Sequence, residues 1–562
     1  MITIMRTRNT YIWPAVLLFT LLAGCSEDFL DVAPTDRISD ESLKASATLF
    51  EGYVINRYMT IRYTDKEAEG SPPGFGRGFE YAMWSSLTDE SVYIHDDNSW
   101  VIQQGALAPN STGIAGTLWA RSYRGIRECN YALNIIDEVD MTDNRREMLR
   151  AELKFIRAYR YFDLIRNYGR VVLLGDRVCN LDDDFTDPNL YKKSDMPECV
   201  DFVVNQLDEA AEYLPVNNTT SWKLGRATKG AALALKARML LYAASPLYNA
   251  GTWQDAADAA KAVMDMNKYS LHADYGSLFL NESSKEIIFE RLFATGSRHV
   301  CLEIANGPNG YSGWAGNVPL QNLIDDYEVL EDEQTAVPYD STNPEYASHP
   351  YENRDPRFYA TILYNGAQYR DRQVETFLPG GRDTKDGIDN WNTSFSGYYL
   401  RKFIDESLPI VNPWDVAGTQ PWIYIRYAEI LLNYAEARNE ATGPDAEVYS
   451  AINQIRARAG MPPLPDNLDK DAMRERIWHE RRVELAFEEH RFYDVRRWMI
   501  AMETENEPAY GISIFKVNDT TFTYNRIIAL EGRRFEKQHY WLPIPLDEIQ
   551  SSGGLLEQNP DY

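Results

Sequence analysis

Five long stretches in the first half of the chain repeat apolar residues every three or four positions, and this pattern constrains the fold more than any other feature. Such a period is typical of amphipathic helices. Small alanine residues, dense in the last stretch, let a neighbouring helix approach closely, so we expect successive pairs to pack as degenerate tetratricopeptide-like hairpins. The predicted helices are 119–139, 146–168, 195–214, 228–244 and 254–266.

The composition and periodicity of the sequence change at about Cys301. From 301 to 420, Gly, Pro, Asn and Tyr are dense, and helical periodicity does not persist. Turn-forming residues around short apolar runs favour loops with short strands. We therefore expect a mostly α protein in which tetratricopeptide-like helical hairpins form a scaffold, with a loop-rich irregular insertion carrying short strands. Strands are predicted at 358–364 and 398–403, and helices return at 425–440, 447–459 and 472–499, the last as one long helix or two.

The charge balance excludes one class of partner. The chain has 84 acidic and 57 basic residues, which gives a formal net charge of −27. Nucleic-acid binding needs a basic surface that neutralises phosphates and releases their counterions. We therefore expect no nucleic-acid partner.

The N-terminus reads as a lipoprotein signal peptide covering residues 1–24. Arg6 and Arg8 precede an apolar run from about 11 to 23, which is shorter than the ~20 residues of a spanning helix. The run ends at Leu22-Ala23-Gly24-Cys25, which resembles a bacterial lipobox and predicts lipidation of Cys25. A plain signal peptide with a chance cysteine is the alternative. The acidic residues in Ser26-Glu27-Asp28 resemble an export signal to the outer face of the outer membrane, or simply begin a solvated tether.

Motifs of catalysis and metal binding are missing from the sequence. The seven histidines form no HExxH pair, and no P-loop or GxSxG elbow occurs. The Arg- and Glu-rich stretch 480–497 is interpreted as a structural ion network. Asp383, Asp386 and Asp389 are read as a solvated turn, with a calcium site as the alternative. We expect no enzyme, metal or cofactor, although a glycosidase-type carboxylate pair is not identifiable from sequence and stays open.

Two polar segments each present a large aromatic ring. Trp314 lies in a stretch from 307 to 317 with four glycines, and Trp100 ends the polar segment 95–100. Glycine-rich backbone cannot build a core around an indole, so we expect an exposed ring on an open turn. Exposed rings beside amide and carboxylate groups suit sugars, whereas each Trp could instead pack in the core. The predicted ligand-binding residues are His95, Asp96, Asn98, Trp100, Tyr311, Trp314 and Asn317.

Ten short motifs, in order along the chain, resemble those of the SusD/RagB family of outer-membrane nutrient-binding lipoproteins. The first is Cys25 to Asp31 with Pro34, and the last is WLPIP (541–545), which ends at Asn559-Pro560. Those between are LTDE (87–90), WARSYRGI (119–126), ELKFIRAYRYF (152–162), GWAGN (313–317), RDPR (354–357), RYAEI (426–430), ERRVEL (480–485) and HRFYD (490–494).

The resemblance implies a division of the mature chain into an N-terminal region, 25–300, and a C-terminal region, 301–562, loop-rich to 420 and helical from 421. It also implies a lipoprotein, anchored in the outer membrane through Cys25 and facing outward. Such a protein captures a glycan and delivers it to a SusC-like TonB-dependent transporter. Peptide cargo with the same fold and partner is one alternative, and an extracellular glycan hydrolase is another.

Overall fold

The computed structural model describes residues 39–61, 82–96, 98–111, 114–296, 298–408 and 418–562. The predicted signal peptide and Cys25 lie outside these residues. Within the described ranges, no helix is long and apolar enough to cross a membrane.

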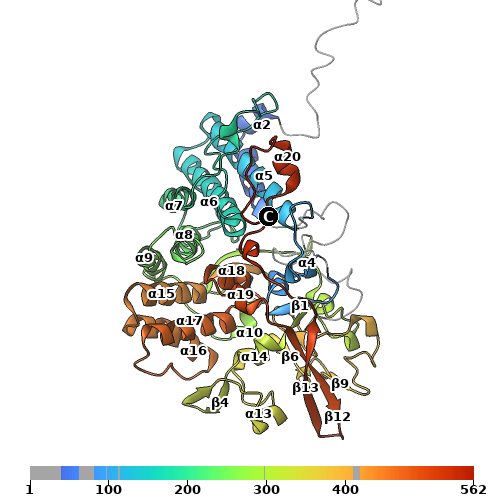
Figure 1. Cartoon of the computed structure of the whole chain (residues 1–562). Helices are drawn as coiled ribbons and strands as arrows, with labels where there is room; N and C mark the ends of the chain where they lie inside the picture. Colours follow the sequence, from blue (N-terminus) through green and yellow to red (C-terminus); the bar gives the residue numbers. More distant parts are fainter. Residues whose placement is uncertain (1–38, 62–81, 97, 112–113, 297, 409–417) are drawn as a thin grey trace, which may run out of the picture.

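Helices stacked side by side form the scaffold along one side of the molecule (Figure 1). Each helix from α5 to α9 packs on the next, and α9 then packs on α15, which contacts α16 and α17. The predicted helices are confirmed, with ends shifted by a few residues. They are α5 (Ile114–Ile135), α6 (Asp143–Tyr168), α7 (Met196–Tyr213), α8 (Lys229–Ala244), α9 (Trp253–Met264), α15 (Tyr427–Thr442), α16 (Ala446–Ala459), α17 (Lys470–Glu484) and α18 (His490–Arg497).

Local signals fix where these helices begin and end. A capping box starts α7: the Asp195 side chain accepts from the Glu198 amide, and the Glu198 side chain accepts from the Asp195 amide. Helix α6 ends at Gly169, which has a φ of 72°. A Cβ at this glycine would lie 3.1 Å from the Trp541 indole, so both the backbone angle and the close packing favour glycine here.

Shorter helices connect the scaffold to the rest of the chain. They are α2 (Asp40–Lys44), α3 (Ala47–Asn56), α4 (Trp100–Gln103), α10 (Tyr275–Leu278), α11 (Leu302–Ala305), α12 (Gln321–Ile324), α13 (Pro344–Ser348), α14 (Pro356–Thr361), α19 (Ala501–Thr504) and α20 (Leu546–Ser551). One-turn 3₁₀ helices include η2 (Arg57–Ile61), η4 (Trp84–Leu87), η5 (Ile136–Glu138), η6 (Pro188–Leu190), η7 (Asn309–Tyr311), η8 (Asn390–Asn392) and η9 (Lys537–Tyr540).

The strands form small separate sheets, most of them in the loop-rich region. Five antiparallel pairs are β1 (Ser91–Tyr93) with β3 (Asn317–Pro319), β2 (Ile287–Arg291) with β11 (Trp422–Arg426), β4 (Val329–Asp332) with β5 (Thr335–Val337), β6 (Ile362–Leu363) with β10 (Tyr399–Leu400), and β7 (Gln368–Tyr369) with β8 (Arg372–Gln373). The one three-stranded sheet among the described residues has the order β13 (Phe522–Leu530), β12 (Ala509–Lys516), β9 (Phe377–Leu378).

Two predictions about these elements are wrong in detail. The predicted strand 358–364 begins as helix α14, because the Asp355 side chain accepts from the Arg357 amide at 2.9 Å and caps a helical turn. Only its end, β6, is extended. The C-terminal part, predicted as helical, also contains the β12–β13 hairpin. Its strands alternate irregularly between buried and exposed positions, so they lack a clear two-residue period.

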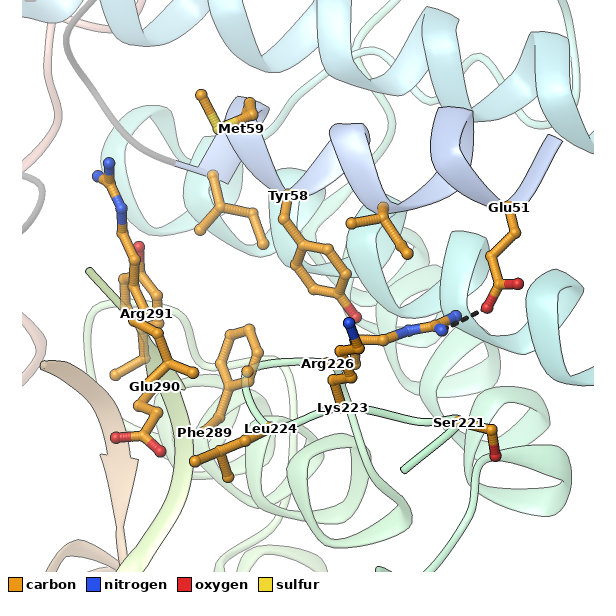
Figure 2. Close-up of a pocket in the computed structure, with 15 residues that line it drawn as sticks. Glu51, Tyr58, Met59, Ser221, Lys223, Leu224, Arg226, Phe289, Glu290 and Arg291 are labelled. Atoms are coloured by element: carbon orange, nitrogen blue, oxygen red, sulfur yellow. Dashed lines mark hydrogen bonds and ion pairs between the residues drawn. The ribbon is translucent and has the colours of Figure 1, made fainter. Parts of the chain in front are cut away.

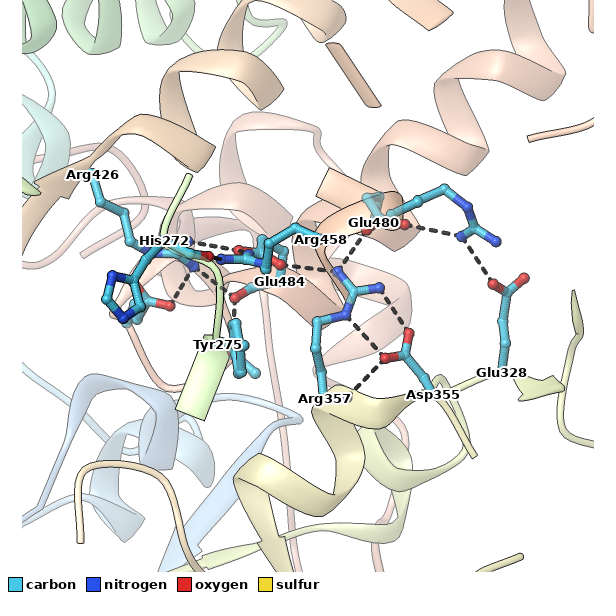
Figure 3. Close-up of polar contacts among 12 residues, drawn as sticks. His272, Tyr275, Glu328, Asp355, Arg357, Arg426, Arg458, Glu480 and Glu484 are labelled. Carbon is cyan, nitrogen blue, oxygen red and sulfur yellow. Dashed lines mark hydrogen bonds and ion pairs between the residues drawn. The ribbon is translucent and has the colours of Figure 1, made fainter. Parts of the chain in front are cut away.

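A buried network of arginine and glutamate side chains joins the scaffold to the loop-rich region (Figure 3). Arg426 at the end of β11 contacts Glu286 (2.7 Å), and Glu484 of α17 (2.6 Å). Arg357 of α14 contacts Glu480 of α17 at 2.6 Å. All five side chains are at most 2 % exposed. This bears out the interpretation of 480–497 as a structural network. Asp494 pairs with Arg481 and Arg497 inside the stretch, while Glu480 and Glu484 find their partners on other elements.

The electrostatics of Glu484 show how strongly the network depends on complete pairing. Burial acts to raise the pKa of this carboxyl, but Arg458, Arg426 and Arg357 outweigh burial and hold the pKa well below its usual range. A buried carboxylate without those arginines would carry an uncompensated charge.

We expect Arg426→Ala to lower the free energy of unfolding by about 3–5 kcal/mol, because it leaves buried carboxylates unpaired. Arg526→Ala is the matched control, since Arg526 is half-exposed in its 3.1 Å pair with Asp325 and should cost less than about 1 kcal/mol. Chemical denaturation monitored by circular dichroism measures both. Equal losses in the two variants would contradict the central role of Arg426.

Candidate functional site

A two-stranded ladder brings the two predicted binding segments together. Strands β1 and β3 run antiparallel with Tyr93 opposite Asn317, so segment 95–100 leaves β1 where segment 311–317 enters β3. The Ile94 amide donates to the Gly316 carbonyl at 3.1 Å. His95 Nε2 lies 2.8 Å from the Trp314 carbonyl oxygen, which makes this nitrogen the donor. The two segments are therefore neighbours in space although they are more than 200 residues apart in sequence.

Asn309 holds a third loop, 383–396, next to the 311–317 segment. Its buried side-chain amide donates to the carbonyls of Thr384 (3.0 Å) and Ile388 (2.7 Å). Its Oδ1 accepts from the Tyr399 hydroxyl at 2.8 Å. The third loop is thereby fixed against the 309–317 segment.

This third loop carries an exposed ring that sequence reasoning missed. The Trp391 side chain is 71 % exposed, and its ring centroid lies 6.2 Å from that of His95. Phe395 is 37 % exposed, and its ring centroid lies 6.2 Å from that of Trp100. We call His95, Trp100, Trp391 and Phe395 the aromatic platform. It consists of two ring pairs, each of which joins the 95–100 segment to the third loop.

Phe395 also borders a small hollow of about 160 Å³. Side chains with hydroxyl groups are frequent around it: Thr376, Thr384, Thr393, Ser394 and Ser513. Hydroxyls next to an exposed ring match the two faces of a sugar, which has apolar C–H groups and hydroxyls of its own.

The other predicted residues of segment 95–100 shape the turn that carries Trp100. Asp96 and Asn98 both have positive φ, of 66° and 63°, and Asn98 is exposed. The Asp96 carboxylate accepts from the Trp100 amide at 3.0 Å. The half-buried Trp100 indole donates to the Tyr93 carbonyl at 2.8 Å. The indole is thus fixed, with one edge turned inward.

The expectation of an open turn around Trp314 is wrong. A Cβ on Gly313 would lie 2.1 Å from the Gly307 carbonyl oxygen, so this glycine serves close packing of two backbone segments. Trp314 itself is half-buried and packs against the main hydrophobic core. The glycines permit tight packing instead of exposure, and the composition of the segment alone does not distinguish the two.

The Tyr311 ring does not form a second open plane beside Trp314. The Arg372 guanidinium lies 4.3 Å from its ring centroid, and Tyr369 packs edge-on against it at 5.2 Å. Its hydroxyl donates to the Tyr369 carbonyl at 3.1 Å and contacts Asp371.

Asn317 is 1 % exposed, and its side chain is part of the framework. Its Oδ1 accepts from the Met83 amide and the Ser86 hydroxyl, both at 2.8 Å, and its amide donates to Asn306 at 2.9 Å. These bonds position the β1–β3 ladder beneath the loops.

The acidic segment 383–389 is only partly the solvated turn that was predicted. Asp383 is buried and binds the Arg372 guanidinium through both oxygens, at 2.7 and 2.8 Å. Asp386 is exposed and accepts from the Gly380 amide. In the part of the chain that the structure describes, no cluster of His, Cys, Asp and Glu could hold a metal ion.

One sequence signal could have identified Trp391. It lies in Asp386-Gly387-Ile388-Asp389-Asn390-Trp391-Asn392, a mostly polar segment with a single aromatic ring, and segment 95–100 has a similar composition. Asn309 carries no comparable signal, because its role depends on carbonyls about 75–79 residues away.

Two family models cover almost the entire chain. One, described as the SusD family, matches residues 239–562, and the other, described as "Starch-binding associating with outer membrane", matches residues 28–241. The chain therefore belongs to the SusD family.

Known relatives agree with this assignment. A SusD-like protein of Bacteroides fragilis is 30 % identical with a TM-score of 0.77, covering 94 % of this chain and all of that one. A SusD-like carbohydrate-binding protein of the same species is 25 % identical with a TM-score of 0.75, covering 92 % and 99 %. In sequence, the SusD-like protein P2 of Formosa agariphila is 24 % identical over 481 residues, which are 81 % of this chain and 82 % of that protein.

The different burial of the two tryptophans leads to a stability prediction. Trp391→Ala should change the free energy of unfolding by less than about 0.5 kcal/mol, as is usual for exposed positions. Trp314→Ala should lower it by roughly 2 kcal/mol, about half of the ~3–5 kcal/mol for a fully buried Trp. Denaturant titration of both variants measures this. If Trp314→Ala had the same free energy of unfolding as the unmodified protein, the Trp314 ring would contribute nothing to the stability of the core.

Proposed function

We propose that this protein is a non-enzymatic surface lipoprotein that captures a glycan on its aromatic platform and delivers it to a SusC-like TonB-dependent transporter. The family assignment supports a binding role at the outer membrane. Relatives named as carbohydrate-binding or starch-binding proteins support a glycan as the cargo.

The single observation that carries this proposal is the exposure of Trp391. An indole that is 71 % exposed contributes little to folding, and it lies in a loop held in place by the buried side chain of Asn309. A fixed exposed ring is available for stacking at little cost in conformational entropy. The second pair, Trp100 and Phe395, extends the ring surface beside a hollow lined with hydroxyl groups.

The environment of the platform favours a neutral cargo. Asp96, Asp386 and Asp389 lie on the platform loops together with one exposed cation, Lys385, and the whole chain carries −27. This negative charge would repel an anionic polysaccharide. Exposed charges are screened within about 8 Å at physiological salt, so they should affect a neutral glycan little. Binding of a neutral glycan should therefore depend weakly on salt.

We expect Trp391→Ala to weaken glycan binding about tenfold while the protein stays folded. The lost stacking is worth about 0.5–1.5 kcal/mol beyond the area that the ring buries, and 1.4 kcal/mol is a factor of ten in Kd. A glycan array identifies a ligand for the soluble mature protein, and calorimetry then compares the variants. Tyr213→Ala is the control, because Tyr213 is an exposed ring at the end of α7 on the scaffold.

Binding and activity assays on the same soluble mature protein distinguish the alternative functions. Binding to a peptide library but not to the glycan array would show that the cargo is a peptide. Release of reducing sugar from a polysaccharide would make the protein a hydrolase. Unchanged glycan affinity in both Trp391→Ala and Trp100→Ala would place the binding site elsewhere.

The proposed anchor gives a separate prediction. Cys25→Ala should leave the protein soluble or uncleaved, because the acyl chains that hold it in the membrane attach at this residue. Membrane fractionation and intact mass spectrometry measure the change. A variant with the same fractionation and the same lipid mass as the unmodified sequence would contradict lipidation at Cys25.

A further inference from the structure

A hollow of about 540 Å³ opens on the helical scaffold, between the α3–η2 segment, the 221–226 loop and strand β2 (Figure 2). None of its lining residues belongs to the platform loops. Three of its apolar side chains, Ile55, Met59 and Leu224, are each more than 40 % exposed and form what we call the apolar rim. The volume lies within the roughly 300–1,000 Å³ of small-molecule sites, and exposed apolar residues favour a ligand with an apolar part.

Aromatic rings form the inner wall of the hollow. Phe289 stacks on Tyr424 with the ring centroids 5.3 Å apart, and the Tyr58 ring lies 6.3 Å from that of Phe289. The Tyr58 hydroxyl donates to Glu152 at 2.8 Å, and Arg226 binds the same carboxylate at 2.6–2.9 Å. Because these polar groups are already bonded, a sugar would find few hydrogen-bond partners here, whereas a hydrocarbon chain needs none.

Arg291 brings a positive charge to this apolar hollow. Residues two positions apart on a strand point to the same side, so Arg291 leaves β2 on the side of Phe289. Figure 2 shows its side chain extending toward the η2 end of the hollow. The guanidinium lies over the Phe293 ring at 4.4 Å, and burial lowers the pKa of Arg291, with no carboxylate among the described residues to offset this effect. A partly buried cation of this kind is stabilised by any anion that pairs with it.

The two acidic residues in the lining do not supply that anion. Glu290 leaves β2 in the direction opposite to Arg291, its oxygens are sealed from solvent, and burial raises its pKa to about 8, so it is mostly protonated at pH 7. Glu51 lies at the other end of the hollow and pairs with Arg226 and Arg145. The guanidinium nitrogens of Arg291, by contrast, are not sealed. An anion that enters the hollow can therefore reach them.

We propose that this hollow binds the anion of a medium-chain fatty acid, with the carboxylate paired to Arg291 and the alkyl chain covering the apolar rim. A planar guanidinium donates two parallel hydrogen bonds to a carboxylate, and the chain removes apolar surface from water. Lys223, exposed on the 221–226 loop, adds a second positive charge to the lining, although the whole chain carries −27. The site is independent of the platform and of its glycan.

Three ligands with the same eight-carbon chain test this proposal: octanoate, octanol and octylamine. Calorimetry of the soluble mature chain at pH 7, with each ligand below the concentration at which it forms micelles, measures the affinities. We expect octanoate to bind about tenfold more tightly than octanol, because its carboxylate forms charge-assisted hydrogen bonds. Octylamine should bind least, because it places an ammonium group beside Arg291.

Variants separate the carboxylate from the chain. Arg291→Met keeps an aliphatic side chain, and it should abolish the preference for octanoate while octanol binding stays the same. Arg291→Lys keeps the charge without the planar fork and should retain only part of the preference. Leu224→Ala, at an exposed position, should weaken octanoate and octanol alike. Arg534→Gln is the control, because Arg534 is an exposed arginine outside the hollow, and it should change neither affinity.

Several results would overturn the proposal. Octanoate binding that is absent, no tighter than that of octanol, or equal in the unmodified protein and in Arg291→Met would each do so. The dipeptide Nα-acetyl-leucyl-leucine, which has a free carboxylate, tests the other occupant of similar chemistry. If it binds more tightly than octanoate, the site takes the carboxyl terminus of a peptide and not a fatty acid.

Discussion

The guanidinium group of Arg426, buried among Glu286, Glu484 and Glu488 at 2.6–2.7 Å, is the contact on which the arrangement of this molecule depends. Its partners come from the turn directly before strand β2, from helix α17 and from the segment after α17. Because each buried charge is costly without the others, these elements must come together as a unit. Glu480, one turn before Glu484 on α17, extends the same network to Arg357 of α14 and so into the loop-rich region.

From that point a short series of contacts leads to the aromatic platform. Helix α14 continues directly into β6, which pairs with β10 so that Leu363 lies opposite Tyr399. The Tyr399 hydroxyl donates to Asn309, and Asn309 in turn holds the loop that carries Trp391. The exposed rings are thus supported by buried, fully bonded groups. Because the buried groups hold the loops in place, the exposed loop residues can be substituted without loss of the loop structure.

Helix α15 shows what the periodicity of a sequence predicts and what it does not. Arg426, Glu429, Asn433, Glu436 and Glu440 recur at steps of three and four residues, so the sequence places them on one face of a helix. A polar stripe ordinarily faces solvent. Here Glu429 binds Arg238 of α8 and Glu436 binds Arg497 of α18, and both glutamates are buried. Periodicity places residues on a face, but it does not tell which other face supplies the opposite charge.

The sequence by itself determined the helices and their order, because helix periodicity and caps such as Asp195 act within a few residues of one another. It also determined the family, through motifs spread over the chain. Only the tertiary structure decided which rings are exposed. Trp314 and Trp391 both lie among small and polar residues, yet one packs on the core and the other faces outward. That difference is set by long-range neighbours: Gly307 approaches Gly313 closely, while Asn309 bonds to the Ile388 carbonyl, and neither contact leaves a local pattern in the chain.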